Sequence, residues 1–295
     1  MRVLILADQY KDPRQELSHR FSEVLKQQGL EVSELVLPNR ALACEDLAEK
    51  EEAAQLLLVL GGDGSFLRAA HLALRWDCPI WGINLGSLGF LLQTETEEAL
   101  RICEDGLSWN EEKLLVSHRS ILQLQHLDQK GRLLTQAKAL NDIVLTSSTQ
   151  TRFVALEVNI DGQMRESFYG DGLILSTSSG STAYALASGG PVVDPILDVM
   201  ELCPLCPHAL HHRPLVLSGE RHIQVELTEL PSDRYEAQIR VDGEQVQIMK
   251  RGESISLSLA KQKLKVISPK GRDNFFELHE KLRRRGEGYR RAHED

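Results

Sequence analysis

The 295-residue chain has no apolar run near the roughly 18 residues that a membrane-spanning helix needs. The apolar stretch at 3–6 is too short for the core of a signal peptide. A net charge of −9 provides no basic surplus, which disfavours nucleic acid or an anionic membrane surface as the main partner. Five cysteines, an odd number, do not indicate a disulfide framework and fit a reducing compartment. These absences predict a soluble cytoplasmic protein.

Two common nucleotide-binding motifs are also missing. No Gly-Lys-Ser or Gly-Lys-Thr occurs anywhere in the chain, which excludes the usual P-loop. The segment 62–67 lacks the third glycine of a dinucleotide fingerprint, and no acidic residue follows about 20 positions later. Any phosphate chemistry must therefore use another loop.

The segment Gly61-Gly62-Asp63-Gly64-Ser65 directly follows the apolar run 56–60. Glycines after a buried strand expose backbone N–H groups and let a phosphate approach closely. A carboxylate in such a loop repels the phosphate by about 3 kcal/mol at about 5 Å and an effective dielectric of about 20. An aspartate at this position therefore suggests one of two roles: it takes the proton from an attacking hydroxyl, or it contacts a metal ion that also contacts the phosphates. The alternative is a turn that merely requires glycine.

A second acidic glycine turn, Gly170-Asp171-Gly172, leads through an apolar run into the hydroxyl-rich segment 177–184. We expect a short helix over 183–187, capped by Ser181 or Thr182, whose N–H groups could hold an anion or a sugar hydroxyl. The alternative is an ordinary capped turn. Asn141 and Asp142 lie in a predicted strand, 139–145, where both can reach one ligand only near the strand's start. A solvated strand edge is the alternative there.

Strand and helix signals alternate over residues 1–105 and predict an α/β domain with an open, mostly parallel sheet. In such sheets ligands bind at the carboxyl ends of strands, where Asp63 falls. Expected strands are 3–7, 31–37, 56–60 and 79–83, and expected helices are 45–54, 65–75, 95–106 and one opened by Asp12-Pro13.

Residues 106–274 contain short runs of period-2 patterning and Asp-Gly turns, including Asp161-Gly162 and Asp242-Gly243, and predict a β-rich second domain. The tail 275–295 is expected to be helical and to pack back on the first domain. Its basic run is interpreted as a solvated tail. Cys203, Cys206 and His208 permit a zinc site, but a proline-rich connection with small apolar thiols is preferred.

Together, the 61–64 loop, Asn141-Asp142, the 170–184 block and Cys206-Pro207-His208 occur in one order that closely resembles NAD kinases. The resemblance covers nearly the whole chain. It implies an N-terminal α/β domain, a C-terminal β domain and a homodimer or homotetramer. It also implies transfer of a phosphoryl group from ATP or polyphosphate to the adenosine ribose 2′-hydroxyl of NAD, giving NADP. Asp63 would take the proton, and Mg²⁺ would be carried by the nucleotide.

The resemblance also assigns residues to binding. The donor-phosphate loop comprises Gly61, Gly62, Gly64 and Ser65. The residues expected to line the NAD site are Asp63, Gly64, Arg68, Asn141, Asp142, Arg152, Tyr169, Asp171, Thr182, Ala183, Tyr184, Ala185, Leu186, Ala187 and Glu244.

Some positions depart from the family pattern. Ser178 and Ser179 replace a more usual Pro-Thr, Tyr169 stands where a basic residue is common, and Glu244 replaces a common glutamine. These changes leave the reaction class intact and bear on the choice between NAD and NADH. Two alternatives stay open. A diacylglycerol-type lipid kinase shares the first motif, although 5% aromatic residues argue against an acyl-binding mouth. A non-catalytic dinucleotide sensor would have little reason to keep Asp63.

Overall fold

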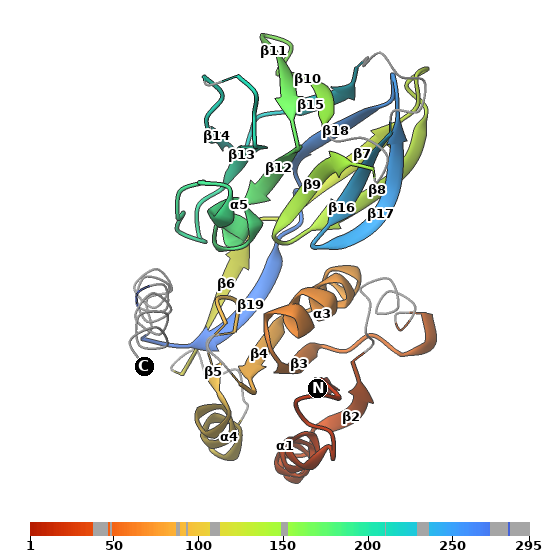
Figure 1. Ribbon diagram of the computed structural model, residues 1–295. Coiled ribbons are helices and arrows are strands. Elements are labelled where there is room, and N and C mark those ends of the chain that lie inside the picture. Colours follow the sequence, from red (N-terminus) through yellow and green to blue (C-terminus); the bar gives the residue numbers. More distant parts are fainter. Residues whose placement is uncertain are drawn as a thin grey trace. The chain divides into compact units, whose positions relative to one another are not determined.

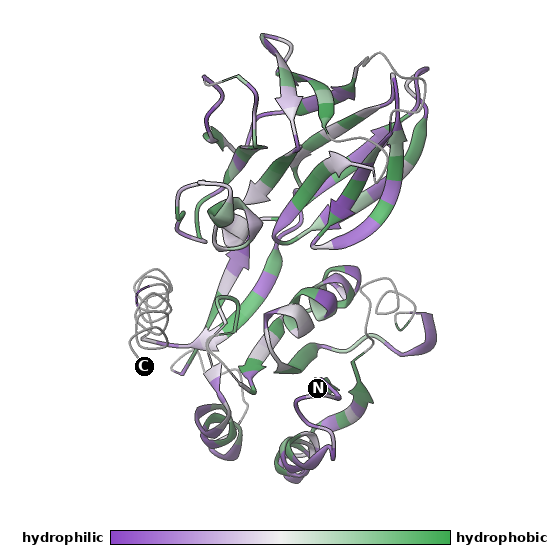
Figure 2. Cartoon of the chain, in the orientation of Figure 1, coloured by the Kyte–Doolittle hydropathy of each residue, from purple (hydrophilic) through white to green (hydrophobic). Residues whose placement is uncertain are grey.

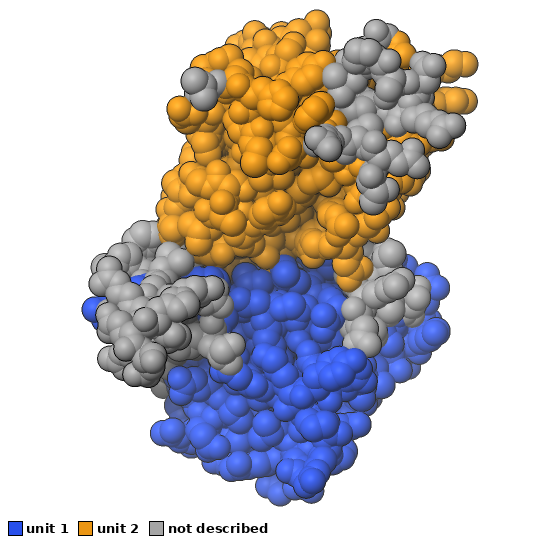
Figure 3. Space-filling view, viewed as in Figure 1, with its two compact units in different colours: residues 1–118, 264–295 blue, residues 119–263 orange. Residues whose placement is uncertain are grey.

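The computed structural model describes residues 1–37, 47, 49–86, 89–92, 94–106, 113–148, 153–209, 211–228, 236–271 and 283 (Figure 1). The chain divides into two compact units, residues 1–118 with 264–295, and residues 119–263 (Figure 3). This division differs from the expected one at 105/106 and 274/275. The reason is that two strands from the expected β domain, β6 (Leu114–Arg119) and β19 (Leu264–Pro269), join the first unit's sheet.

The first unit is built on a seven-stranded sheet in the order β2-β1-β3-β4-β19-β6, with β5 paired to β4. The pairings of β1 with β2 and β3, of β3 with β4, and of β4 with β5 and β19 are all parallel. The expected mostly parallel α/β sheet is therefore confirmed. Its other elements are β1 (Arg2–Ala7), α1 (Glu16–Gln27), β2 (Glu31–Val36), β3 (Leu56–Gly61), α3 (Asp63–Trp76), β4 (Ile80–Asn84), β5 (Thr94–Glu95) and α4 (Thr96–Glu104).

The centre of this sheet is apolar on both faces. All six residues of β3 are buried, as parallel strands covered on both faces require. Strand β3 is coloured as hydrophobic in Figure 2. Leu58, Trp81 and Ile5 lie in one buried cluster with Phe21 of α1. This packing places the ends of β1, β3 and β4 together, since Ala7 pairs with Leu60, and Gly61 pairs with Asn84.

Helix α1 begins later than expected. Asp12 and Pro13 precede it instead of forming its first turn, and Gln15 has a left-handed backbone with φ of 55°. The Asp12 carboxylate accepts the N–H groups of Leu17 at 3.3 Å and Ser18 at 2.9 Å. These bonds satisfy donors that the first helical turn leaves free. Of the helix expected over 45–54, residues 47, 49 and 50 are helical, whereas 51–54 are not, so the helix ends earlier than expected; 45, 46 and 48 lie outside the described residues. All of the tail over 275–295 except Arg283 also lies outside them.

The second unit contains two antiparallel six-stranded sheets, in the orders β11-β10-β15-β18-β7-β8 and β14-β13-β12-β9-β16-β17. The β-rich architecture predicted for this part of the chain is confirmed. The elements are β7 (Leu122–Leu127), β8 (Leu133–Ala139), β9 (Asp142–Ser147), β10 (Val154–Ile160), β11 (Met164–Gly170), β12 (Gly172–Thr177), a 3₁₀ turn η1 (Ser179–Thr182), α5 (Tyr184–Ala187), β13 (Val199–Leu205), β14 (Leu215–Ser218), β15 (Ile223–Leu227), β16 (Glu236–Val241), β17 (Glu244–Lys250) and β18 (Ser254–Leu259).

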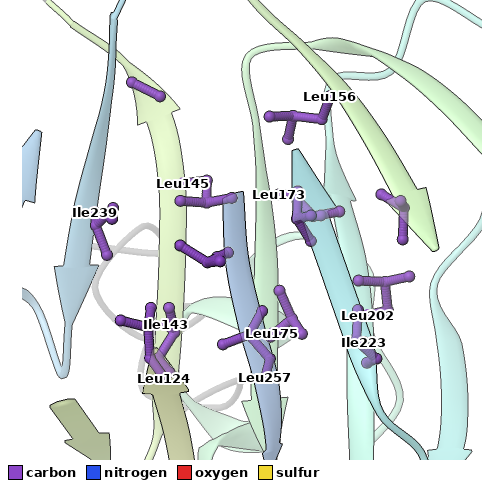
Figure 4. Packing of buried hydrophobic residues seen from close by; sticks show 14 of the residues in the cluster. Leu124, Ile143, Leu145, Leu156, Leu173, Leu175, Leu202, Ile223, Ile239 and Leu257 are labelled. Carbon is purple, nitrogen blue, oxygen red and sulfur yellow. The ribbon is translucent and has the colours of Figure 1, made fainter. Parts of the chain in front are cut away.

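A single apolar cluster joins the two sheets of this unit. Side chains such as Leu145 and Leu175 of one sheet and Leu156 and Leu257 of the other belong to it (Figure 4). The Asp161-Gly162 turn closes the expected hairpin between β10 and β11, and both residues have positive φ. Such φ values match the twist of a hairpin, which explains why Asp-Gly is favoured there. None of the helices in the described ranges is long and apolar enough to cross a membrane.

Candidate active site

The glycine loop of the first unit is a sharp strand-to-helix turn. β3 ends at Gly61, Gly62 is extended, and α3 begins at Asp63. A Cβ atom on Gly61 would lie 2.5 Å from the Cβ of Ser65, so the turn requires glycine there. Among the described residues no side chain caps the start of α3, which leaves its first N–H groups available to an anion.

The Asp63 carboxylate is fixed by a second turn. One oxygen accepts the N–H of Phe90 at 2.7 Å, and the other accepts the N–H of Leu91 at 3.1 Å. A Cβ on Gly89 would lie 2.0 Å from Oδ1 of Asp63, so only glycine permits this close approach. Each carboxylate oxygen has a further lone pair. The half-buried Asp63 is therefore held in one orientation and can still accept a proton.

Asp8, which the sequence analysis did not single out, supports the same loop. Its carboxylate accepts the Ser65 hydroxyl at 2.5 Å and lies 3.5 Å from Nη2 of Arg68. Burial pushes its pKa upward, but the Ser65 hydrogen bond, the N–H of Tyr10 and the charges of Arg68 and Lys11 outweigh burial and leave the pKa lowered. Asp8 is thus ionised at neutral pH. Ser65 and Arg68 of the expected site are positioned by it.

In the second unit, the expected strand 139–145 is interrupted. β8 ends at Ala139 and β9 begins at Asp142. The Asp242 carboxylate accepts the N–H groups of Leu140 at 2.9 Å, Asn141 at 2.7 Å and Asp142 at 3.2 Å. The prediction of one continuous strand was wrong, because the N–H groups at 140–142 bond to a carboxylate. Asp242 was expected only as part of a turn.

Asp142 consequently stands at the first position of β9, and it is 5% exposed. Burial and the nearby Asp242 charge raise the pKa of its carboxyl, the N–H of Tyr184, which donates to Asp142, partly offsets both, and the resulting pKa is about 7. This bond joins two residues of the predicted NAD site. The side chain of Asn141 is buried, and its Oδ1 atom has no partner among the described residues.

The hydroxyl-rich segment 177–184 uses most of its hydroxyls internally. Thr177 donates to the carbonyl of Leu140 at 2.6 Å, and Ser181 donates to the carbonyl of Ser178 at 2.8 Å. Ser178, Ser179 and Ser181 are buried. The expected cap by Ser181 or Thr182 was wrong: Ala183 occupies the cap position of α5 without a side-chain hydrogen bond.

The part of this segment that reaches the surface runs from Thr182 to Ala187. The side chain of Tyr184 is 48% exposed, whereas Ala185 is buried. Thr182, Ala183 and Leu186 are intermediate. The internal hydrogen bonds hold the backbone, and the residues expected to line the NAD site occupy its outer turn.

A row of buried polar side chains lies under this segment. Ser176 of β12 pairs in register with Asp142 of β9 on one side and with Glu201 of β13 on the other. A Cβ on Gly180 would lie 2.4 Å from the Ser176 hydroxyl, and one on Gly190 would lie 2.8 Å from Oε2 of Glu201. The glycines thus let the segment cover this row closely.

Three other expected residues, Tyr169, Asp171 and Glu244, lie at strand ends of the same unit. The Cys206 thiol donates to Asp171, which raises the thiol's pKa. The Tyr169 ring is 40% exposed and lies 6.4 Å from the ring of His208. Glu244 follows the Asp242-Gly243 turn at the start of β17.

Arg152 lies outside the described residues. As for the cysteine–histidine cluster, Cys203 is buried beside Glu201, and Cys206 is exposed beside Asp171. The described part of the chain holds no group of three or more histidine, cysteine, aspartate or glutamate side chains arranged for a metal ion.

The parallel sheet with its acidic glycine loop, followed by a two-sheet β unit with a buried acidic strand start, is the arrangement expected of a phosphotransferase that acts on a nucleotide. Comparison with known proteins makes this specific. Residues 5–108 match the ATP-NAD kinase N-terminal domain, and residues 140–268 match the ATP-NAD kinase C-terminal domain. The chain belongs to the NAD kinase family, and its activity is the phosphorylation of NAD with ATP.

Similar proteins span the chain. The NAD kinase of Geotalea daltonii is 34% identical over 292 residues, covering 96% of this chain and 99% of the relative. That of Moorella thermoacetica is 39% identical over 252 residues, covering 83% and 78%.

Two solved structures share the fold. Yeast NADH kinase complexed with NADH has a TM-score of 0.76 at 22% identity, covering 94% of this chain and 86% of that one. An NAD kinase from Archaeoglobus fulgidus in complex with ATP has a TM-score of 0.69 at 24% identity, covering 96% and 99%. Family membership decides against the lipid kinase and the non-catalytic sensor.

Proposed function

We propose that Asp63 is the general base of the reaction, taking the proton from the adenosine ribose 2′-hydroxyl of NAD. The observation that carries this proposal is the double hydrogen bond from Phe90 and Leu91, which fixes the carboxylate beside the glycine loop. A fixed carboxylate with unused lone pairs lowers the cost of positioning a base. The N–H groups that α3 leaves uncapped, with the loop Gly61, Gly62, Gly64 and Ser65, would hold the donor's phosphates.

NAD is proposed to be bound by the residues that the family resemblance assigned. Asp142 would accept hydrogen bonds from NAD, and the outward turn Thr182–Ala187 would line the ligand beside it. The hydrogen bond from the N–H of Tyr184 to Asp142 supports a shared site. Arg68, Asn141, Arg152, Tyr169, Asp171 and Glu244 are proposed as further NAD contacts. The yeast relative was solved with NADH, so whether this protein uses NAD or NADH is part of the test.

A divalent cation, Mg²⁺, fits this arrangement only as a partner of the donor. The oxygens of Asp63 already accept backbone N–H groups, and those of Asp8 accept the Ser65 hydroxyl and the N–H of Tyr10. The described part of the chain also holds no group of three or more histidine, cysteine, aspartate or glutamate side chains arranged for a metal ion, so the proposal places Mg²⁺ with the donor. Mg²⁺ carried by the donor's phosphates would neutralise part of their charge.

Two further expectations rest on the family resemblance. The protein is proposed to work in the cytoplasm and to form a homodimer or homotetramer. Sedimentation equilibrium of the purified chain measures the second.

The experiment that tests the proposed chemistry supplies purified protein with NAD or NADH and with either ATP or polyphosphate. NADP should form with Mg²⁺ and stop when EDTA is added. An NAD analogue with 2′-deoxyadenosine should compete with NAD and give no phosphorylated product. NADP itself should be a poor acceptor, because its 2′-oxygen is already esterified. A phosphorylated product from the deoxy analogue would show that the reacting hydroxyl is a different one.

A further inference from the structure

The side chain of Lys11 lies beside the glycine loop that follows β3. Lys11 follows β1 through a tight turn in which its own N–H bonds to the carbonyl of Asp8 at 3.1 Å. Its side chain then lies against two glycines: a Cβ on Gly62 would be 2.5 Å from the Lys11 ammonium, and a Cβ on Gly86 would be 3.2 Å from it. Gly62 follows β3 and Gly86 follows β4. The ammonium therefore lies where three neighbouring strands of one sheet end.

The charges around this ammonium leave it available to a ligand. Asp8 is the nearby acid, but its carboxylate already receives the Ser65 hydroxyl and pairs with Arg68 at 3.5 Å. Within the described residues, Lys11 makes no side-chain hydrogen bond or ion pair of its own. Lys11 is exposed, and its ammonium lies over the backbone of Gly62 and Gly86, which have no side chains that it could contact.

We propose that Lys11 is a donor-binding residue, whose ammonium contacts the phosphate chain of the phosphoryl donor at the Gly61–Ser65 loop. The inference rests on the proposed placement of the donor at that loop. An ammonium is a compact point charge that suits phosphate oxygens and tolerates several donor conformations. Because it approaches Gly62 rather than the Asp63 carboxylate, its role is to bind the donor and not to move the proton.

The test compares Lys11→Met with Lys11→Arg and with a control, Lys26→Met. Lys26 is a half-exposed lysine of α1 that pairs with Glu34 at 3.7 Å, so its substitution removes the same charge at a distance from the loop. A charge-assisted contact of this kind corresponds to about 10- to 100-fold in binding. We expect Lys11→Met to raise KM for ATP by that factor, with KM for NAD changed less than twofold. Lys11→Arg should recover part of the loss, and the control should match the wild type.

Competition by inorganic tripolyphosphate identifies the contacted group. If Lys11 meets the phosphate chain, Lys11→Met should weaken inhibition by tripolyphosphate by the same factor as it raises KM for ATP. An unchanged KM for ATP in folded Lys11→Met would overturn the inference, and so would a matching rise in KM for NAD. If Asp63→Asn is inactive while Lys11→Met binds ATP normally, only the role of Lys11 fails. If Asp63→Asn is active, the proposed base fails while Lys11 is still judged by its ATP dependence.

Discussion

Glu201 provides a sharp physical prediction, because it is a buried carboxyl group that has no charge partner among the described residues. Its side chain is fully buried on β13, Oε1 has no partner among the described residues, and the Cys203 thiol is 3.8 Å from Oε2. Burial raises its pKa and the hydrogen bond from the Cys203 thiol lowers it in part, so that the pKa moves from 4.5 to about 7. The folded protein therefore favours the protonated form, and ionisation of Glu201 destabilises it.

The sign and size of the effect follow from proton linkage. Because the folded pKa is above the unfolded one, the stabilising effect of protonation is complete below pH 4.5 and is lost as pH rises to about 7. At 1.36 kcal/mol per pKa unit, the rise in pKa from 4.5 to about 7 means that ionisation of Glu201 lowers the free energy of unfolding by at most about 3 kcal/mol. Glu201→Gln keeps the shape of the protonated carboxyl and cannot ionise.

Thermal unfolding of both proteins at pH 5 and pH 8 measures this difference. The variant should be close to the wild type at pH 5 and more stable at pH 8, by about 6–12 °C in melting temperature if 1 kcal/mol corresponds to about 2–4 °C. Glu226→Gln, an exposed glutamate on β15, is the matched control and should show no such pH dependence. If the difference in melting temperature between Glu201→Gln and the wild type stayed constant from pH 5 to pH 8, the claim that ionisation of the buried Glu201 destabilises the protein would be refuted.

Two further predictions concern the NAD-binding unit. Asp142→Ala should raise KM for NAD by about 10- to 100-fold, because a hydrogen bond to a charged acceptor contributes about 1.5–3 kcal/mol, while KM for ATP changes much less. Because its pKa is raised to about 7, the Asp142 carboxylate should become protonated and lose its negative charge as the pH falls below that value. The KM of the wild type for NAD should therefore rise at low pH, whereas the KM of Asp142→Ala should not. If Asp142→Ala had a normal KM for NAD, Asp142 would have only a structural role. Gly180→Ala should lower the melting temperature and raise KM for NAD together, because its Cβ would lie 2.2 Å from the Asn141 carbonyl oxygen, and such overpacking costs about 1–3 kcal/mol. Normal stability in that variant, measured by thermal melting, would show that the segment moves freely away from Asn141.

The α/β sheet and the β-rich unit could be predicted from the sequence because their signals are local. The buried run 56–60 and the glycines after it specify a central strand and a turn without reference to the rest of the chain. The Asp161-Gly162 hairpin is equally local, since both residues adopt the positive φ that the turn needs. Asp63 could be singled out for the same reason, as a carboxylate in a loop suited to phosphate.

Features that depend on distant partners could not be predicted in this way. The break between β8 and β9 is caused by Asp242, which lies about 100 residues away and accepts three N–H groups. The return of β19 to the first unit's sheet depends on parallel pairing with β4. Asp8 and Lys11 carry no motif, and only the joint ending of β1, β3 and β4 brings them to the glycine loop.

The central claim, that Asp63 takes the proton from the ribose hydroxyl, is tested most directly by Asp63→Asn. The amide keeps the size of the side chain but cannot accept the proton. Asp77→Asn is the matched control: it makes the same chemical change at the other end of α3, where Asp77 has a left-handed backbone that asparagine also adopts. Both variants are measured for kcat and, by calorimetry, for NAD binding.

We predict that Asp63→Asn lowers kcat by about 10²- to 10⁴-fold while its Kd for NAD stays within about threefold of the wild type. Asp77→Asn should keep both values. If Asp63→Asn retained more than about a tenth of the wild-type kcat, Asp63 would not be the base.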